Sequence, residues 1–404
     1  MASCLMLAPF PLARPRHGGQ THAANILQAG RRAGWHMESV SIFPADSFPS
    51  DEWGAFDIAL DSAALSERVA SDMPFADFHV ARAAAGDDQV VQRLRGLILR
   101  FMPDIIQVEH PWGWLVLQKA LPSTKKIPIV YSSHNIEWRA REPLFQLGLK
   151  NATSDNMLAA TRLLEEELAR TADLVFSISE REAREIEQVA GRPVVYLPAV
   201  SDLALPQSRL GSTRFSTEAR LTSCCYAALM GSNYWPNVEG FFALFPDGLG
   251  FLRQGEQIWM AGALGDAIVN DPRYSTFFSI NETRSRNVGY LDVAEKADFF
   301  ATASCVIVPV TFGAGAKLKT ADAIASGQPV IATSHAVDGY RPIVERAAGQ
   351  GIYIADTPAE FRAWIRRALR EKLPGCTIDV RAMLSPEAMT HSWSTHLGNL
   401  LAGH

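Results

Sequence analysis

Short apolar runs, many of them rich in β-branched residues, alternate along the chain with longer stretches of helical character. This alternation is typical of parallel sheets with helices on both faces. The runs form two series, which are LMLAPF (5–10), ESVSIF (38–43), DIIQVEH (104–110), PIVYSSH (128–134), DLVFSIS (173–179) and VVYLPA (194–199), then YAALMGS (226–232), QIWMAGAL (257–264), CVIVPV (305–310), PVIATS (329–334) and GIYIAD (351–356). The pattern predicts an α/β fold with two doubly wound domains.

Residues 201–223 separate the two series. They are rich in Ser, Thr and Arg and show little periodicity, which is typical of a linker. The chain has 404 residues, more than a single core usually holds. We therefore predict an N-terminal domain of residues 1–200 and a C-terminal domain of residues 224–384.

Composition narrows the class of protein. With 48% hydrophobic and 20% charged residues and a net charge of -5, the chain has a globular composition and no general attraction for nucleic acid. Its five cysteines lack metal-ligand spacing and favour a reducing, cytoplasmic compartment. No apolar run approaches the ~20 residues of a membrane span. The stretch QVVQRLRGLILRFM (89–102) is expected to pack on the sheet; the alternative is peripheral contact with the inner membrane surface.

Polar residues just after the strands are the first candidates for a site, because open α/β sheets bind ligands beyond the carboxyl ends of their strands. After the first strand, His17 precedes Gly18, Gly19 and a predicted helix. Glycines let the backbone approach a ligand, and a helix N-terminus attracts anions. These residues predict either a phosphate-binding loop or a simple turn.

His134 is the strongest polar candidate in the first half. It ends the run PIVYSSH, and Glu137 and Arg139 follow it in SSHNIEWRAR. At a strand end its imidazole can donate to a sugar hydroxyl or a phosphate oxygen; a lone histidine can also satisfy loop backbone. His110, at the end of the preceding run, is a weaker candidate.

Two polar segments follow strands in the second half. Gly231, Ser232 and Asn233 form a small turn that either meets a pyrophosphate or only caps the next helix. The second segment, TFGAGAKLKTADAIASG (311–327), combines glycines, lysines and an aspartate.

In this second segment, Gly313 and Gly315 leave room for backbone N–H groups to face phosphate, and Lys317 and Lys319 add positive charge at the same helix terminus. Asp322 can accept from two ribose hydroxyls. We expect it to be a helix-surface carboxylate whose loss weakens binding more than stability. The alternative is a glycine turn before a solvated helix.

Taken in order, these motifs resemble those of the retaining GT-B glycosyltransferases of family 4. The resemblance rests on the GG loop, HN-x-E (134–137), GS-x-YWPN (231–237) and GAGAKLK-x-x-DA-x-ASG-x-PV-x-AT (313–333). It implies two Rossmann-like domains facing a deep cleft, with the acceptor on the N-terminal domain and a nucleotide-sugar donor on the C-terminal one. It also implies a C-terminal helix, residues 385–404, that crosses back to the N-terminal domain.

The chain departs from the family pattern in two places. Relatives often carry two glutamates in the last motif. In this chain Ala314 stands at the position of the first glutamate and Asp322 at that of the second, so the motif does not identify the donor sugar. A basic pair is missing from GSNYWPN, so Lys317 or Lys319 is expected to meet the diphosphate.

The resemblance implies transfer of a hexosyl group, with retention, from a nucleoside-diphosphate sugar to a hydroxyl of a glycan, lipid-linked or similar acceptor. His134, Lys317 and Lys319 would serve catalysis, with His134 binding the donor sugar or its phosphate. Donor-binding residues would be Gly18, Gly19, Gly231, Ser232, Asn233, Gly313, Ala314, Gly315 and Asp322. Acceptor-side candidates are His17, His110, Glu137 and Arg139. Because no Asp-x-Asp pair occurs, we expect no metal, and no cofactor besides the donor substrate.

Two other functions stay open from the sequence. A nucleotide-sugar epimerase would use the same diphosphate site without an acceptor, and a non-catalytic sugar-nucleotide-binding protein is compatible with Ala314 and the missing basic pair. A Rossmann dehydrogenase is disfavoured because neither domain has G-x-G-x-x-G after its first strand.

Overall fold

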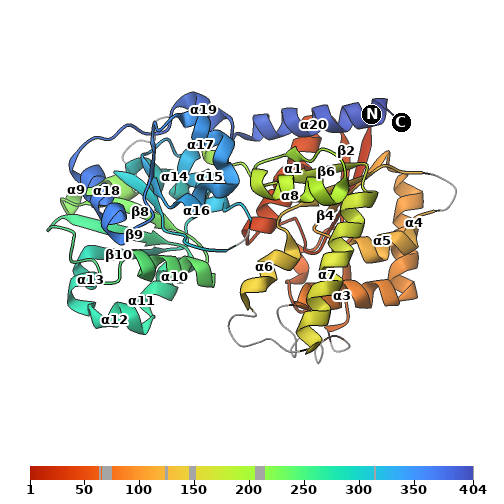
Figure 1. The fold of residues 1–404 in the computed structure, drawn as a ribbon, viewed down its shortest axis with the longest axis horizontal. Coiled ribbons are helices and arrows are strands. Elements are labelled where there is room, and N and C mark those ends of the chain that lie inside the picture. Colours follow the sequence, from red (N-terminus) through yellow and green to blue (C-terminus); the bar gives the residue numbers. More distant parts are fainter. Residues whose placement is uncertain are drawn as a thin grey trace. The chain divides into compact units, whose positions relative to one another are not determined.

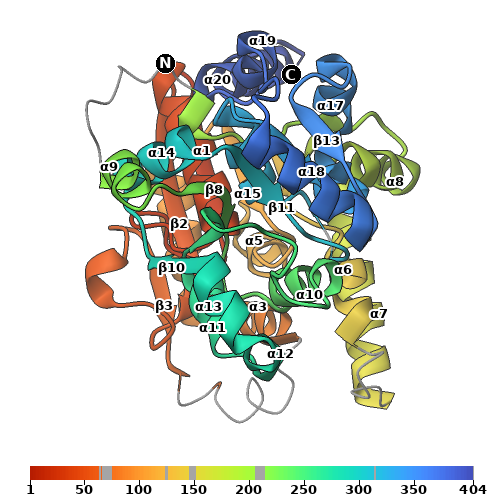
Figure 2. The same ribbon diagram turned by 90° about the vertical axis from the view of Figure 1, so that its left-hand side faces the viewer.

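The computed structural model describes residues 1–62, 65, 75–122, 126–144, 152–204, 214–313 and 315–403. The chain divides into two compact units, each built around one parallel sheet flanked by helices (Figures 1 and 2). The first unit holds Met1–Pro198 and Met389–His404, and the second holds Ala199–Ala388. The α/β fold with two doubly wound domains, which the strand and helix patterns predicted, is confirmed.

The sheet of the first unit has seven strands in the order β3-β2-β1-β4-β5-β6-β7. They are β1 (Ser3–Ala8), β2 (His36–Pro44), β3 (Ile58–Leu60), β4 (Ile105–Glu109), β5 (Ile129–Ser133), β6 (Leu174–Ser177) and β7 (Val195–Tyr196). Only β3 was not predicted, because three residues are too few to show a pattern. The strand order reverses between β1 and β4, and their carboxyl ends form a topological switch point, the usual ligand position in such sheets.

Helices cover both faces of this sheet. They are α1 (Gly18–Arg32), α3 (Ala76–Gly86), α4 (Asp88–Phe101), α5 (Trp114–Ala120), α6 (Glu137–Leu144), α7 (Ala152–Thr171), α8 (Glu180–Ala190) and α20 (Pro386–Ala402), with a 3-10 turn η1 (Ser50–Glu52). Leu5 and Leu7 of β1 pack in the core that α3, α4, α5 and α7 cover. The C-terminal helix α20 lies beside α1 (Figure 1), where the Trp393 and Trp35 rings meet edge to face at 5.1 Å.

The amphipathic stretch 89–102 lies almost entirely in α4. Val90, Leu94 and Ile98 are buried in the core, which confirms the expected packing. Arg93 donates to the Asp57 carbonyl oxygen at 2.8 Å, and Arg95 donates to the Lys119 carbonyl oxygen at 2.6 Å. In the described part of the chain, no helix combines the length and apolar character needed to cross a membrane.

The sheet of the second unit has six parallel strands in the order β10-β9-β8-β11-β12-β13. They are β8 (Cys225–Met230), β9 (Glu256–Ala261), β10 (Ser285–Gly289), β11 (Cys305–Val308), β12 (Val330–Ala332) and β13 (Ile352–Ile354). β10 was not predicted because its sequence, SRNVG, has one aliphatic residue. The order reverses between β8 and β11, which gives this unit its own switch point.

Alternate residues of these strands build two separate cores, one on each face, as the two-residue period of a strand requires. Ala227, Leu229 and Ile307 belong to one core, and Ala228, Val306 and Val308 belong to the other. The helices are α9 (Arg214–Leu221), α10 (Trp235–Leu244), α11 (Ala263–Val269), α12 (Pro272–Thr276), α13 (Phe278–Arg284), α14 (Val293–Thr302), α15 (Leu318–Ala325), α16 (Ser334–Val337), α17 (Arg341–Ala347), α18 (Pro358–Arg370) and α19 (Ile378–Ala382), with 3-10 turns η4 (Asp202–Ala204) and η5 (Asp338–Tyr340).

Part of the predicted linker is a structural element. Helix α9 packs on α14, Phe215 is fully buried, and its backbone N–H donates to Asp298 Oδ2 at 3.0 Å. Residues 205–213 of the predicted linker lie outside the described residues. The prediction missed α9 because Phe215 is the only residue that this short, polar helix buries.

Candidate functional site

A cluster of polar residues lies at the switch point of each unit. In the first unit, the histidine cluster consists of His17, His22, Glu109, His110, His134 and Glu137, which come from α1, from the end of β4 and from the segment after β5. In the second unit, the lysine cluster consists of Asn237, Gly313, Gly315, Lys317 and Lys319, which come from α10, from the segment between β11 and α15 and from the first turn of α15. Since β1, β4 and β5 are neighbours, as are β8 and β11, parallel pairing brings each set to one sheet edge.

His134 is buried against a carboxylate. Its Nε2 lies 2.7 Å from Glu109 Oε2, and Glu109 is fully buried at the end of β4. Burial, followed by the neighbouring His110, lowers the pKa of His134, so the ring is neutral near pH 7. Sequence reasoning missed Glu109, although its place beside His110 at a strand end was a signal.

His110 makes a second pair of the same kind. Its Nδ1 lies 2.7 Å from Glu137 Oε1, and Arg141 donates to Glu137 Oε2 at 2.5 Å. Burial alone would raise the pKa of Glu137, but the hydrogen bond to His110 and the Arg141 guanidinium outweigh it and lower that pKa to about 2. His110 also has a φ of 60°. A non-glycine residue held in the left-handed region is a frequent feature of functional sites.

Four ring nitrogens of this cluster are buried and, among the described residues, have no hydrogen-bond partner: both nitrogens of His22, Nε2 of His110 and Nδ1 of His134. The His110 and His134 rings are 4.0 Å apart, and His22 meets His134 edge to face at 4.9 Å. Unpaired buried polar atoms cost free energy. Their concentration in one place indicates a position for a polar ligand. His22, on α1, was not predicted.

The glycine pair begins α1 and does not form a separate loop. His17 is the N-cap, and its side chain accepts from the Gln20 N–H. Gly18 and Gly19 are the first residues of the helix, whose N–H groups have no partner within it. Burial, then His110 and His134, lowers the pKa of His17 to about 4. The imidazole at the N-terminus of α1 is therefore neutral at pH 7.

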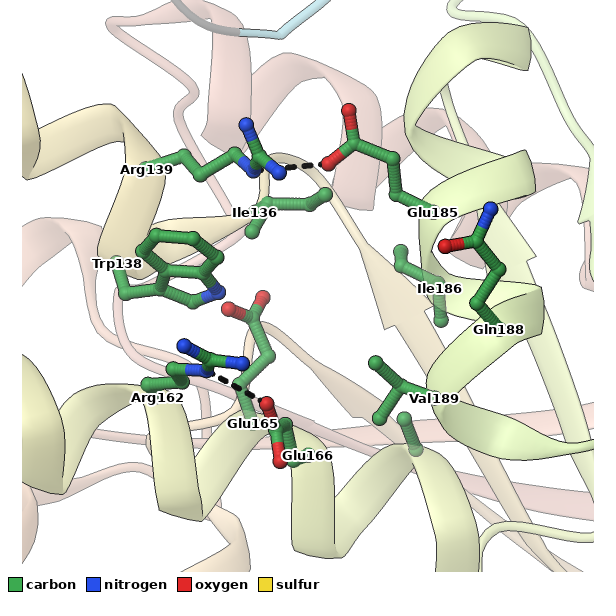
Figure 3. Close-up of a pocket in the computed structure, with 11 residues that line it drawn as sticks. Ile136, Trp138, Arg139, Arg162, Glu165, Glu166, Glu185, Ile186, Gln188 and Val189 are labelled. Atoms are coloured by element: carbon green, nitrogen blue, oxygen red, sulfur yellow. Dashed lines mark hydrogen bonds and ion pairs between the residues drawn. The ribbon is translucent and has the colours of Figure 1, made fainter.

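Arg139 does not join the histidine cluster. It pairs with Glu185 at 2.8 Å and lies over the Trp138 ring, on whose other side Arg162 lies (Figure 3). These side chains line a pocket of about 170 Å³ between α6, α7 and α8. Glu165, also in this pocket, accepts from Tyr131 Oη at 2.9 Å, and burial together with Glu137 raises its pKa to about 8.

In the second unit, the turn after β8 uses its own polar groups. The Gly231 N–H donates to the Ala261 carbonyl at 3.2 Å, and the Ser232 carbonyl accepts from Asn237 Nδ2 at 3.0 Å. Asn233 is exposed. Pro236 lies in the first turn of α10, as predicted. The N–H of Gly231 therefore already has a partner within the unit, and the contact of this turn with a pyrophosphate stays a prediction.

Glycines shape the segment after β11. Gly313 and Gly315 have φ values of 109° and 69°, which side chains rarely tolerate. Lys317 Nζ donates to both of their carbonyl oxygens, at 3.0 and 2.8 Å. His335, which follows β12 and was not predicted, lies 2.7 Å from the Gly313 carbonyl oxygen. Ala314 lies outside the described residues.

Lys319 lies beside α10. Its Nζ donates to Asn237 Oδ1. α10 can come this close because residue 240 is glycine: a Cβ there would lie 1.8 Å from the Pro309 carbonyl oxygen. Burial, followed by the charge of Lys317, lowers the pKa of Lys319 to about 7. An anion at this place would restore the ammonium form.

Asp322 differs from the predicted helix-surface carboxylate. It is buried, and it accepts from Ser201 Oγ at 2.5 Å and pairs with Lys296 Nζ at 2.7 Å. The sequence pattern placed Asp322 on the side of α15 that carries Lys319, but it gave no sign of Ser201 or Lys296, which come from distant parts of the chain. Both carboxylate oxygens thus already have partners within the second unit.

Comparisons with known proteins agree with this architecture. Residues 17–199 match the model of the glycosyl transferase 4-like domain, and residues 257–371 match that of glycosyl transferases group 1. No curated protein matches the chain in sequence.

Solved structures with the same fold include the sucrose-phosphate synthase of Thermosynechococcus elongatus (14% identity, TM-score 0.63, 100% of both chains). Anabaena HepE in complex with UDP and glucose is similar over 100% of both chains (13% identity, TM-score 0.65). A structure described as trehalose-6-phosphate from E. coli bound with UDP-2-fluoro glucose is also similar. The match covers 98% of the present chain and 99% of the E. coli chain (14% identity, TM-score 0.60). Two segments of the chain thus match glycosyl transferase models, and the GT-B fold that the motifs implied is confirmed.

Proposed function

We propose that this chain is a retaining glycosyltransferase that moves a hexosyl group from a nucleoside-diphosphate sugar to a hydroxyl of a glycan, lipid-linked or similar acceptor. The observation that carries the proposal is the lysine cluster. The partly buried ammonium of Lys319 donates to a neutral amide and lies near a second ammonium, that of Lys317. An anionic diphosphate bound there would supply the missing negative charge.

The proposed roles divide between the two units. Lys319 meets the diphosphate, and Lys317 holds the Gly313 and Gly315 carbonyls so that the loop keeps its shape. The unpaired nitrogens of the histidine cluster bind hydroxyl groups of the sugar. The leaving phosphate itself accepts the proton of the acceptor hydroxyl, so no side chain acts as an obligatory base.

A UDP-sugar is the first donor to test, because HepE and the E. coli structure hold UDP or a UDP-sugar. For a lipid-linked acceptor, we propose a cytoplasmic protein that touches the inner membrane surface through the arginines of α4. Arg93 and Arg95 already donate to backbone carbonyls, so this contact would depend mainly on Arg100. Flotation with anionic vesicles, with and without Arg100→Ala, tests it.

The test of function is an assay of nucleoside diphosphate release from a panel of nucleotide-sugars, with and without glycan and lipid acceptors. We expect release that depends on the acceptor, and a product whose anomeric configuration, read by NMR, equals that of the donor. Conversion of the donor to an epimer without acceptor would instead identify an epimerase, and donor binding without turnover on any acceptor would identify a non-catalytic protein. The family matches favour transfer over both alternatives.

A further inference from the structure

A continuous line of hydrogen bonds joins the C-terminal helix to the histidine cluster. Trp393 Nε1 of α20 donates to Gln107 Oε1 at 2.9 Å, Gln107 Nε2 donates to Glu109 Oε1 at 2.5 Å, and Glu109 Oε2 lies 2.7 Å from His134 Nε2. Trp393, Gln107 and Glu109 are fully buried, and His134 is 3% exposed. All four residues belong to the first unit.

The direction of each bond follows from the indole. A tryptophan N–H can only donate, so it fixes the Gln107 oxygen toward α20 and the Gln107 amino group toward Glu109. That amino group donates to Glu109 Oε1, and the other carboxylate oxygen, Oε2, faces the imidazole. An ionised carboxylate only accepts, so the proton of the His134 ring must be on Nε2.

The opposite orientation of the Gln107 amide would disrupt its hydrogen bonds to Trp393 and to Glu109. With the Gln107 amide turned over, its amino group would face the indole N–H and its oxygen would face a carboxylate oxygen. Glu109 would then need a proton, which it could donate to His134 Nε2, and the ring proton would move to Nδ1. Nδ1 of His134 is buried and, among the described residues, has no partner. The direction of the hydrogen bond between Glu109 and His134 Nε2 therefore decides whether Nδ1 acts as an acceptor or as a donor.

We propose that Trp393 is a positioning residue: through Gln107 and Glu109 it holds His134 in the Nε2–H form and so presents Nδ1 as a hydrogen-bond acceptor. An acceptor at this place suits a sugar hydroxyl, which can donate, and not a phosphate oxygen, which at neutral pH mostly accepts. The identity of this ligand rests on the proposed function, whereas the position of the ring proton does not. The lowered pKa of His134 agrees with a neutral ring.

The experiment reads the ring proton directly. Protein labelled with ¹⁵N-histidine is studied by two-bond ¹H–¹⁵N NMR at pH 7.5, and the His134 signals are identified by their loss in His134→Gln. We expect the protein to show Nε2–H, and Trp393→Phe to shift the population toward Nδ1–H. Gln107→Met, which removes the donor to Glu109, should shift it further and serves if Trp393→Phe does not fold.

The matched control is Trp259→Phe. Trp259 is also fully buried, and its indole N–H donates to a glutamine oxygen, Gln257 Oε1, at 2.7 Å, but it lies in the second unit. We expect this variant to lose thermal stability while the His134 signals stay unchanged. Nδ1–H in the unaltered protein, or equal His134 signals in the Trp393→Phe and Trp259→Phe variants, would overturn the proposal.

Turnover gives the second readout. Loss of one buried hydrogen bond of ~1.4 kcal/mol corresponds to about tenfold, so we expect Trp393→Phe to lower kcat about tenfold and to leave UDP affinity within about twofold. If no sugar transfer is found at all, the NMR result still decides the position of the proton. In that case the assignment of a sugar as the ligand is refuted together with the proposed function, and the NMR spectra alone test the positioning role of Trp393.

Discussion

The histidine cluster and the lysine cluster lie at equivalent switch points of two parallel sheets, yet their charged groups differ. Carboxylates are the charged groups of the first cluster, and ammonium groups are those of the second. In the first unit, buried carboxylates pair with His134 and His110, and each of these rings keeps one buried nitrogen that has no hydrogen-bond partner among the described residues. In the second unit, the ammonium groups of Lys317 and Lys319 donate to carbonyl and amide oxygens. This difference matches our proposal that the first unit binds hydroxyl groups and the second binds an anion.

The largest effect should come from the lysine cluster. Lys319→Met is expected to lower turnover by about 10²–10³-fold, because one preorganised charge on the leaving group is worth that much in comparable sites. Steady-state kinetics and thermal unfolding measure rate and fold together, and Lys372→Met, at an exposed lysine, is the control. A folded Lys319→Met variant with unchanged kcat would break the comparison.

In the histidine cluster, His134→Gln is expected to lower kcat by about 10²-fold. UDP affinity should change by less than about twofold, because in our proposal the diphosphate contacts the other unit. Calorimetry with UDP and kinetics with the donor separate the two quantities, and His391→Gln at an exposed histidine is the control. Equal losses of UDP affinity and of rate would contradict the assignment of hydroxyl groups to the first unit.

Asp322→Asn tests the carboxylate that was predicted on the helix surface and is buried in the structure. We now expect a loss of about 1–3 kcal/mol in the free energy of unfolding, since the variant removes the charge paired with the partly buried Lys296. Urea unfolding measures this loss. If stability is unchanged while donor affinity falls tenfold or more, the ribose contact predicted from the sequence is correct after all.

The pH dependence of UDP binding should distinguish the clusters further. Lys319, with its pKa lowered to about 7, is charged below that pH and neutral above it. Its contribution to affinity for a diphosphate is therefore present at pH 6 and lost as the pH rises to 8.5, by roughly tenfold. Because the terminal phosphate of UDP also ionises near pH ~6, the quantity to compare is the difference between the unaltered protein and Lys319→Met. No difference in slope would refute the assignment.

The smallest effect is expected from metal removal. Because Lys319 and helix N-termini are proposed to meet the charge of the diphosphate, the initial rate of chelator-treated protein in excess EDTA should equal the rate with added manganese or magnesium. Near-complete loss in EDTA, reversed by one of these ions, would show that the lysine cluster does not act alone.

The sequence alone determined the repeating α/β order and the positions of most strands, because a buried parallel strand needs a local apolar run whatever surrounds it. It also placed His134, His110, Gly313, Lys317 and Lys319 just after strands, and hence at one edge of each sheet. Where the local pattern was weak it failed, as at β3, β10 and α9. It did not reveal that Asp322 is buried, because a helical carboxylate has the same local pattern with and without a partner.

Only the tertiary structure decided which groups pair. Trp393 reaches Gln107 across 286 positions, Lys319 reaches Asn237 across 82, and Ser201 reaches Asp322 across 121. These contacts depend on how sheets and helices pack, and no local periodicity records them. The protonation of a buried imidazole or ammonium depends in turn on such partners and on burial. The chemistry of the two switch points is therefore a property of the folded units, even though the residues that carry it stand at positions that the sequence makes visible.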